Sequence, residues 1–190
     1  MLALRATVTA ANDGMWDRIF GIETAGEDCR PTSYRVLFKV FRAIDLSPAD
    51  QFVDFGCGRG RVMCVAARYP MQRVTGVELD PVTATAARDN LSKLAGRKAA
   101  AWSVETGTAA DFDCSGGTVF YFYNPFGGAL FAEVVGNVRR AARAAPGPVR
   151  VVYVNPVCRE VLDGADWLGP GEVVHTGVDG GAAALVYRVC

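Results

Sequence analysis

A cluster of glycines is the part of the sequence best suited to chemistry. Residues 52–60 read FVDFGCGRG, directly after strand-forming residues and directly before a helical pattern. Glycines at such a junction let the backbone turn sharply and approach a ligand, because no Cβ stands in the way. The dinucleotide-binding fingerprint Gly-x-Gly-x-x-Gly would place a third glycine at position 61, which is Arg61. The spacing is instead the tighter Gly-x-Gly-x-Gly from Gly56 to Gly60, with Asp54 two residues before it.

An acid at the end of the next predicted strand indicates a ribose. Glu78 lies near the end of the strand-like run 73–79, 18 residues beyond Gly60. A carboxylate in this place can accept hydrogen bonds from both hydroxyls of a ribose, and its charge repels a 2′-phosphate. We therefore expect an adenosine-type ligand at this end of the strands.

The elements that must position these groups alternate between strand and helix. This alternation is typical of a parallel sheet covered by helices. The last two strands leave no room for a helix between them, and the turn Asp179-Gly180-Gly181 predicts a hairpin there. The strand patterns occupy residues 52–55, 73–79, 100–106, 118–123, 149–154, 172–176 and 183–189.

Helix signals fill the gaps between the strands. The clearest helix is predicted over 81–95, because Asp80 is a natural N-cap, Pro81 suits the first helical position and Gly96 suits the end. Other helical patterns follow the glycine cluster and the strand 118–123. Before the first strand, a helix is predicted over residues 32–43. We therefore expect a single domain, 1–190, with an N-terminal lid (1–48) and a cofactor-binding core (49–190).

Composition limits the classes of protein to consider. The 190 residues are 51% hydrophobic, and 20 basic residues balance 20 acidic ones. A chain without net charge lacks the general attraction to phosphate backbones of most nucleic-acid binders. The six cysteines form no C-x-x-C pair, and with the single histidine His175 they do not suggest a metal site. Without a signal-peptide pattern or a membrane span, we expect a cytoplasmic protein.

Two segments of the chain resemble the first two motifs of the class I S-adenosylmethionine-dependent methyltransferases. They read VDFGCGRG at residues 53–60 and VTGVELDP at residues 74–81. The terminal hairpin is similar too, since that family closes a seven-stranded sheet with one antiparallel strand. The resemblance implies a Rossmann-like α/β fold with a mostly parallel seven-stranded sheet and helices on both faces. It also implies S-adenosylmethionine as the cofactor.

The resemblance assigns cofactor-binding roles to residues at three strand ends. In that family the glycine loop wraps the methionine part of the cofactor, the first acid organises the loop and the amino group, and the second acid binds the ribose. A segment after the third strand holds the adenine; it commonly carries an acid where this chain has Thr108. The implied cofactor-binding residues are Asp54, Gly56, Cys57, Gly58, Gly60, Glu78, Leu79, Thr108 and Ala109.

The segment Tyr123-Asn124-Pro125-Phe126 resembles the Asn/Asp-Pro-Pro-aromatic signature of amino-methylating enzymes, although the second proline is absent. In those enzymes the Asn oxygen and a proline carbonyl accept hydrogen bonds from the target amine, while the aromatic ring stacks on the acceptor. The alternative is that Asn124-Pro125 merely ends a strand. The resemblance therefore makes Asn124, Pro125 and Phe126 candidate catalytic residues.

The pattern also resembles a bacterial subgroup of methyltransferases of unassigned substrate, with a distant likeness to the non-SET histone-lysine methyltransferases. The shared features are a Gly-Ile-Glu-Thr loop at residues 21–24, the following Tyr34, Gly60-Arg61 and Tyr-Asn-Pro-Phe. If the likeness extends to the lid, Glu23, Thr24 and Tyr34 border the active site. The alternative is that the loop is a surface connection.

We therefore predict a methyltransferase that methylates nitrogen in a small molecule or peptide, without a membrane or nucleic-acid partner. Methyl transfer from a sulfonium is an in-line displacement, so alignment and desolvation do most of the work and a strong base is optional. Three alternatives stay open: methylation of a protein side chain or RNA, a non-catalytic cofactor-binding module, and, more remotely, a nicotinamide-dependent oxidoreductase. The sequence does not indicate the oligomeric state.

Overall fold

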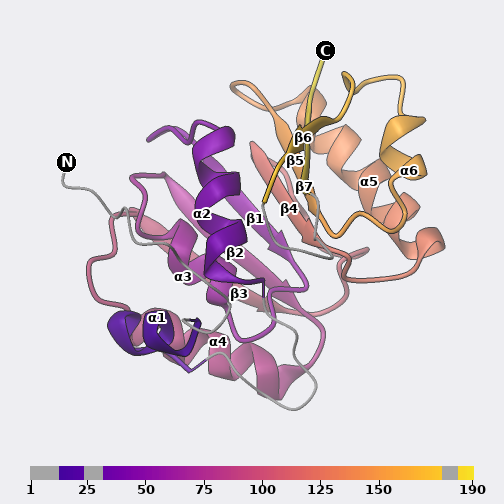
Figure 1. Cartoon of the computed structure of the whole chain (residues 1–190). Helices are drawn as coiled ribbons and strands as arrows, with labels where there is room; N and C mark the ends of the chain where they lie inside the picture. Colours follow the sequence, from indigo (N-terminus) through magenta and orange to yellow (C-terminus); the bar gives the residue numbers. More distant parts are fainter. Residues whose placement is uncertain (1–12, 24–31, 177–183) are drawn as a thin grey trace.

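The structure is a computed structural model that describes residues 13–23, 32–176 and 184–190 (Figure 1). Its strands are β1 (Gln51–Phe55), β2 (Arg73–Glu78), β3 (Ala101–Thr106), β4 (Val119–Tyr123), β5 (Arg150–Val154), β6 (Glu172–Val174) and β7 (Ala184–Arg188). Its helices are α1 (Asp13–Phe20), α2 (Tyr34–Ala43), α3 (Arg61–Ala66), α4 (Pro81–Lys93), α5 (Gly128–Arg143) and α6 (Glu160–Asp163).

All seven strands join one sheet in the order β3-β2-β1-β4-β5-β7-β6. Strands β1 to β5 pair in parallel, whereas β7 pairs antiparallel with both β5 and β6. The predicted seven-stranded, mostly parallel sheet with an antiparallel C-terminal pair is therefore confirmed. The predicted turn 179–181 lies outside the described residues.

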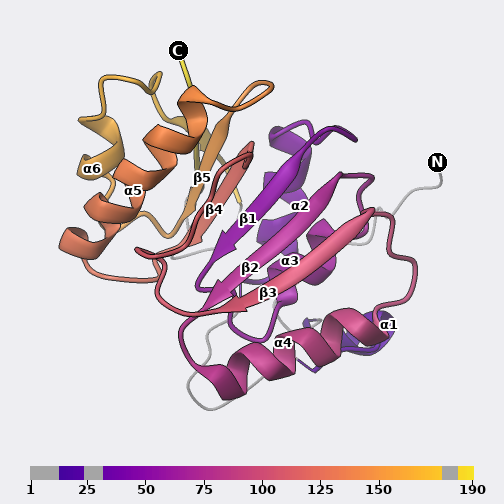
Figure 2. The same cartoon turned by 180° about the vertical axis from the view of Figure 1, so that it is seen from behind.

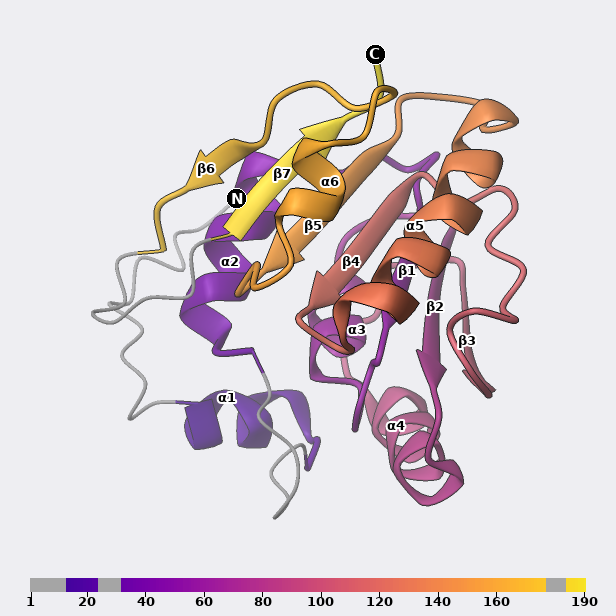
Figure 3. The same cartoon turned by 90° about the vertical axis from the view of Figure 1, so that its right-hand side faces the viewer.

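Helices cover both faces of the sheet, as Figure 3 shows with α2 and α5 on opposite sides. One core cluster joins α1, α2, α3 and α4 to one face, and a second joins α5 and α6 to the other. Strand β4 contributes to both clusters by alternation: Tyr121 faces the first, whereas Phe120 and Phe122 face the second. The connection from β3 to β4 has no helix, and Ala109 and Cys114 in it pack in the second cluster, on the face of the sheet that Figure 2 shows.

Local signals explain where the helices begin. Asp80 caps α4 by accepting a hydrogen bond from the Thr83 N–H, and Pro81 occupies the first turn, which confirms the predicted start. Ser33 caps α2 in the same way, through the Val36 N–H. Helices α1 and α2 bury their apolar faces in the same cluster as the sheet, so they form part of the core layer. The lid role of residues 1–48 stays a prediction.

The parallel strands end at one edge of the sheet, where β1, β2 and β4 place their last residues side by side. Asp54 pairs with Gly76 on β2 and with Tyr121 on β4. In open parallel sheets, ligands bind beyond the carboxyl ends of the strands. No helix in the described ranges is long and apolar enough to cross a membrane.

Candidate active site

A cavity of about 1030 Å³ opens at the carboxyl edge of the sheet. It brings together residues from the glycine loop, the ends of β2 and β3 and the segment after β4. The predicted site residues that line it are Asp54, Gly56, Cys57, Gly58, Glu78, Leu79, Thr108, Ala109, Asn124, Pro125 and Phe126. Gly60, Glu23 and Tyr34 are not among its lining residues.

The glycine loop has a conformation that only glycine adopts easily. Gly56, Gly58 and Gly60 have positive φ angles of 73°, 55° and 83°. The N–H groups of Gly56 and Cys57 both donate to the carbonyl of Val77, which ties the loop to β2. Gly60 lies outside the lining because it forms the turn into α3, where an added Cβ would stand 3.2 Å from Ala87.

Gly56 lets the loop approach the segment after β4, and its replacement tests this packing. A Cβ at this position would lie 2.9 Å from the Cβ of Pro125. We expect Gly56→Ala to destabilise the fold by roughly 1–2 kcal/mol from backbone strain alone and to weaken binding of S-adenosylhomocysteine. Chemical denaturation and calorimetry measure both effects. Gly147→Ala is the control, because nothing lies within 4 Å of the added Cβ there; equal losses in both variants would contradict the argument.

Glu78 holds the loop in place with backbone hydrogen bonds. Its Oε2 accepts from the N–H of Gly58 at 2.9 Å, and its Oε1 accepts from the N–H of Asp80 at 3.1 Å. Both carboxylate oxygens are thus fixed beside the cavity, where their remaining lone pairs can accept further hydrogen bonds. Leu79, the next residue, lines the cavity with 72% of its surface exposed. An exposed apolar side chain beside a fixed carboxylate fits a nucleoside, whose base covers the apolar surface and whose ribose meets the acid.

Asp54 is a buried acid without a hydrogen-bond partner for one oxygen. It is 2% exposed, and its Oδ2 has no partner among the described residues. Burial, and after it the charge of Glu78, raises the pKa of Asp54 to about 8. An unsatisfied acceptor in a cavity costs stability unless a ligand donates to it. An ammonium group meets this need, so the site fits the amino group of an S-adenosylmethionine-type ligand.

We expect the affinity for S-adenosylhomocysteine to rise with pH, by up to roughly tenfold per unit below about pH 8, because the ammonium group binds ionised Asp54. Calorimetry in buffers of different ionisation enthalpy should show proton release on binding near pH 7. Asp54→Asn should bind weakly and without this release. A variant that kept the release would contradict the role of Asp54.

The same buried acid should make folding pH-dependent. The pKa of Asp54 rises from 3.8 to about 8 in the folded chain, which therefore holds a proton that the unfolded chain has lost. The contribution of Asp54 to the free energy of unfolding therefore decreases as the pH increases from 3.8 to about 8. The Asp54→Asn protein should lack this part of the decline in a series of thermal melts.

On the adenine side of the cavity, Thr108 shapes a turn. Its hydroxyl accepts from the N–H of Ala110 and its carbonyl accepts from the N–H of Asp111. Asp111 is exposed and does not line the cavity. Thr108 and Ala109 both line it. Their contact with a base stays a prediction.

On the opposite side, Asn124 directly follows β4 and has a φ of 39°, an uncommon conformation for a residue other than glycine. Tyr153 on β5 donates its hydroxyl to Asn124 Oδ1 at 3.3 Å and accepts the N–H of Cys158 at 3.2 Å. The tyrosine hydroxyl thus uses its proton for Asn124 and a lone pair for the backbone. Phe126 packs edge-on against Phe122, and the centres of the two rings lie 6.4 Å apart. The asparagine is therefore held by its neighbours, beside an aromatic wall.

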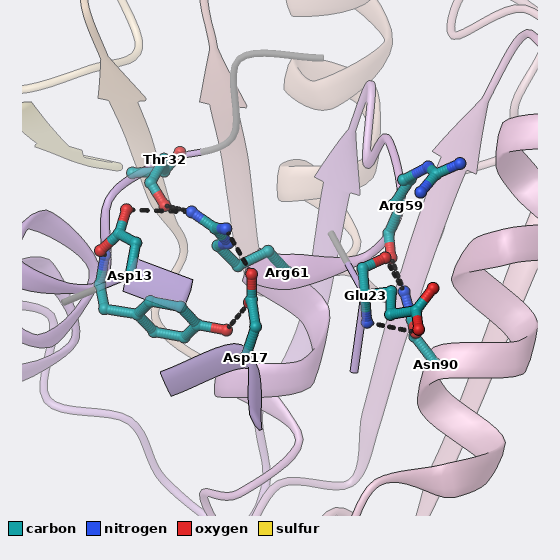
Figure 4. A network of polar contacts seen from close by, with 8 residues as sticks. Asp13, Asp17, Glu23, Thr32, Arg59, Arg61 and Asn90 are labelled. Carbon is teal, nitrogen blue, oxygen red and sulfur yellow. Dashed lines mark hydrogen bonds and ion pairs between the residues drawn. The ribbon is translucent and has the colours of Figure 1, made fainter. Parts of the chain in front are cut away.

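A buried ionic network, missed by sequence reasoning, joins the N-terminal helices to the glycine loop (Figure 4). Arg61, 5% exposed, forms ion pairs with Asp13 at 3.1 Å and Asp17 at 2.8 Å. Its guanidinium also lies 4.9 Å from the centre of the Tyr34 ring. Tyr34 donates its hydroxyl to Asp17 at 2.5 Å and is fully buried. The structure thus places Tyr34 behind the cavity, where it supports Arg61.

Thr32 and Tyr121 connect this network to the cavity, which both residues line. The Thr32 carbonyl accepts from Arg61 at 3.5 Å, and its hydroxyl lies 3.1 Å from that of Tyr121. Burial raises the pKa of Tyr121 well above its usual value, so this phenol stays protonated. In the sequence, Tyr121 was marked as a site residue only by its place in the strand that precedes Asn124.

Asn90 makes a second connection between the N-terminal segment and the glycine loop. Its amide group donates to the carbonyls of Glu23 and Arg59, both at 2.9 Å, and its Oδ1 accepts from the N–H of Glu23 at 3.0 Å (Figure 4). The backbone of Glu23 is thus fixed beside the loop, whereas its side chain is exposed. Thr24, the next predicted loop residue, lies outside the described residues.

No group of three or more His, Cys, Asp or Glu side chains in the described part of the chain is arranged to hold a metal ion. The side chains of the cavity instead suit a ligand that is part nucleoside and part amino acid. They include the Glu78 carboxylate, the unpartnered oxygen of Asp54 and the exposed Leu79.

Comparisons with known proteins agree with this geometry. The family model described as "Histone methylation protein DOT1" matches residues 18–112, half of the chain. The ribosomal protein L11 methyltransferase of Nitrosomonas europaea is 42% identical over 45 residues, which cover 24% of this chain and 14% of that protein. The chain therefore matches only a small part of the length of this curated relative.

Solved structures show the same fold. An RNA methyltransferase from Salinibacter ruber, in complex with S-adenosyl-L-homocysteine, has a TM-score of 0.61 at 23% identity and covers 84% of this chain and 92% of its own. A precorrin 8W decarboxylase from Methanobacterium thermoautotrophicum has a TM-score of 0.63 at 16% identity. The match covers 89% of this chain and 96% of that protein's chain. The sequence-based assignment to S-adenosylmethionine-dependent methyltransferases is confirmed at the level of fold and family. The chain belongs to the family whose model is described as "Histone methylation protein DOT1".

Proposed function

We propose that this protein transfers a methyl group from S-adenosylmethionine to a nitrogen atom of a small molecule or peptide. The observation that carries the proposal is that one cavity holds both the acids suited to the cofactor, Asp54 and Glu78, and the polar end of β4 at Asn124. The cofactor supplies an electrophilic methyl group when bound. The proposal therefore needs the chain only to bind, align and desolvate the acceptor.

Each residue on the acceptor side has a role in this proposal. Asn124 Oδ1 accepts a hydrogen bond from the target nitrogen, because Tyr153 occupies only one of its two lone pairs. Phe126 provides an apolar surface that excludes water. Pro125 seats the segment against Gly56, which brings the two halves of the cavity together.

A protein side chain is the second candidate acceptor. The matched family model is described by histone methylation, and the partial relative is named for methylating a ribosomal protein. RNA is less favoured, although one structural neighbour is called an RNA methyltransferase, because the chain has no net charge to attract a phosphate backbone.

The test is formation of S-adenosylhomocysteine with three sets of acceptors: small amines, lysine-containing peptides and total RNA. We expect turnover with amines or peptides that increases with pH until the acceptor nitrogen is deprotonated. Turnover with RNA alone, lost on addition of salt, would support the RNA alternative. Cofactor binding without turnover on any set would support a non-catalytic module.

A further inference from the structure

Strand β5 ends in the same way as β4, with an asparagine followed by a proline. Asn124-Pro125 follows β4, and Asn155-Pro156 follows β5. Tyr123 and Val154, the residues just before the two asparagines, are paired in register on adjacent parallel strands. Neighbouring strands lie about 5 Å apart, so the two asparagines leave the sheet side by side.

Both asparagines adopt the left-handed conformation, with φ angles of 39° for Asn124 and 50° for Asn155. Asp45 is the one other residue besides glycine with positive φ in the described ranges, and it does not line the cavity. Such conformations cost on the order of 1–3 kcal/mol and cluster at functional sites. Two in register at the rim of one cavity therefore indicate a functional constraint.

The two carboxamides differ in their hydrogen bonds. Tyr153 donates to Asn124 Oδ1, which fixes that side chain. Asn155 lines the same cavity, and its side chain has no hydrogen-bond partner among the residues that the structure describes. Its carboxamide offers two donors and one acceptor oxygen. It can thus meet a ligand group next to the one that Asn124 contacts.

We propose that Asn155 is a second acceptor-binding residue that works as a pair with Asn124. Two adjacent carboxamides best match a substrate that carries, beside its target nitrogen, a group with both a hydrogen-bond donor and a hydrogen-bond acceptor, such as a carboxamide. A simple ammonium ion, which only donates, uses half of the pair. This inference rests on the proposed function, because it assigns the polar end of the cavity to the methyl acceptor.

The test is binding of three small probes to the protein saturated with S-adenosylhomocysteine. The probes are acetamide, which donates and accepts, acetone, which only accepts, and methylammonium, which only donates. Nitrogen-15 NMR follows the side-chain amide resonances of both asparagines, assigned from Asn124→Gly and Asn155→Gly. We expect acetamide to shift both pairs of resonances saturably below about 100 mM, and to bind more tightly than acetone or methylammonium.

Variants of Asn155 separate recognition from structure. Asn155→Gly keeps the positive φ available and should weaken acetamide binding by roughly three- to tenfold, the effect of one lost hydrogen bond. Asn155→Asp replaces the carboxamide by a negatively charged group that only accepts hydrogen bonds. This variant should therefore bind methylammonium more tightly than acetamide. Asp45→Gly, at the left-handed position outside the cavity, should leave all three affinities unchanged.

The inference is overturned if acetamide leaves the Asn155 resonance unmoved, or if Asn155→Asp binds the probes in the wild-type order. Either result is distinguishable from failure of the proposed function. Probe binding does not require methyl transfer, and methyl transfer measured with amines or peptides stands whether or not Asn155 contacts the acceptor.

Discussion

Replacing Asn124 by Ala should lower turnover by roughly 10²- to 10³-fold, the effect of removing one aligned polar contact from a reacting centre. The affinity for S-adenosylhomocysteine should stay within about twofold of wild type, because Asp54 and Glu78 are unchanged. The reason is geometric: Asn124 is held by Tyr153 and is positioned to orient the acceptor nitrogen. Formation of S-adenosylhomocysteine with the best acceptor of the test sets measures turnover, and calorimetry measures affinity.

A glycine variant controls for the backbone at this position. Alanine is strained at a φ of 39° by roughly 1–2 kcal/mol, whereas glycine is not. Asn124→Gly should therefore lose turnover as Asn124→Ala does, without the loss of stability. Tyr153→Phe, which removes the positioning hydroxyl alone, should cause a smaller loss. Turnover near wild type in Asn124→Gly would show that the carboxamide does not act on the acceptor.

Replacing Arg61 by Met should destabilise the protein by about 3–5 kcal/mol, because it removes the cation that is paired with the buried Asp17 and the half-buried Asp13. Asp17 is 8% exposed, and Asp13 lies beside it on the same helix. Methionine retains the apolar part of the arginine side chain. The loss of stability therefore measures the effect of removing the guanidinium charge and its hydrogen bonds. Chemical denaturation measures the change in the free energy of unfolding. The affinity for S-adenosylhomocysteine should fall as well, since Arg61 directly follows the glycine loop.

Two further variants separate the network from a general effect of charge. Arg139→Met removes the exposed ion pair with Asp166 and should cost no more than about 1 kcal/mol. Adding Asp17→Asn to Arg61→Met should restore part of the lost stability, because the charge that Arg61 paired with at 2.8 Å is then removed as well. A loss in Arg61→Met that is no larger than that in Arg139→Met would contradict a stabilising role for the network.

The strands and the cofactor side of the site could be predicted because their signals are local. The glycine loop, the acid at the end of β2 and the cap Asp80 each act within a few residues of their own position. Strand patterns of apolar residues follow from burial on both faces of a parallel sheet. The sequence therefore predicted the strands, the start of α4 and the residues from Asp54 to Glu78 that line the cavity.

The support behind the site depends on contacts between residues far apart in the chain. Arg61 meets Asp13 across 48 positions, and Asn90 meets Glu23 across 67. No periodicity or spacing encodes such pairs. The resemblance placed Tyr34 at the border of the active site if the likeness extends to the lid, whereas the structure buries Tyr34 against Asp17. Asn155 did carry a signal, since its Asn-Pro pair repeats that of Asn124. The repeat points to a shared site only when the pairing of β4 with β5 is known, because that pairing brings the two asparagines side by side.

A crystal structure with S-adenosylhomocysteine bound tests the central claim most directly. We predict that the ligand lies in the cavity at the carboxyl edge of the sheet, with its ribose on Glu78, its amino group at Asp54 and its sulfur beside Asn124 and Phe126. A ligand bound elsewhere, or one whose sulfur faces away from Asn124, would contradict the proposed methyl transfer at the end of β4.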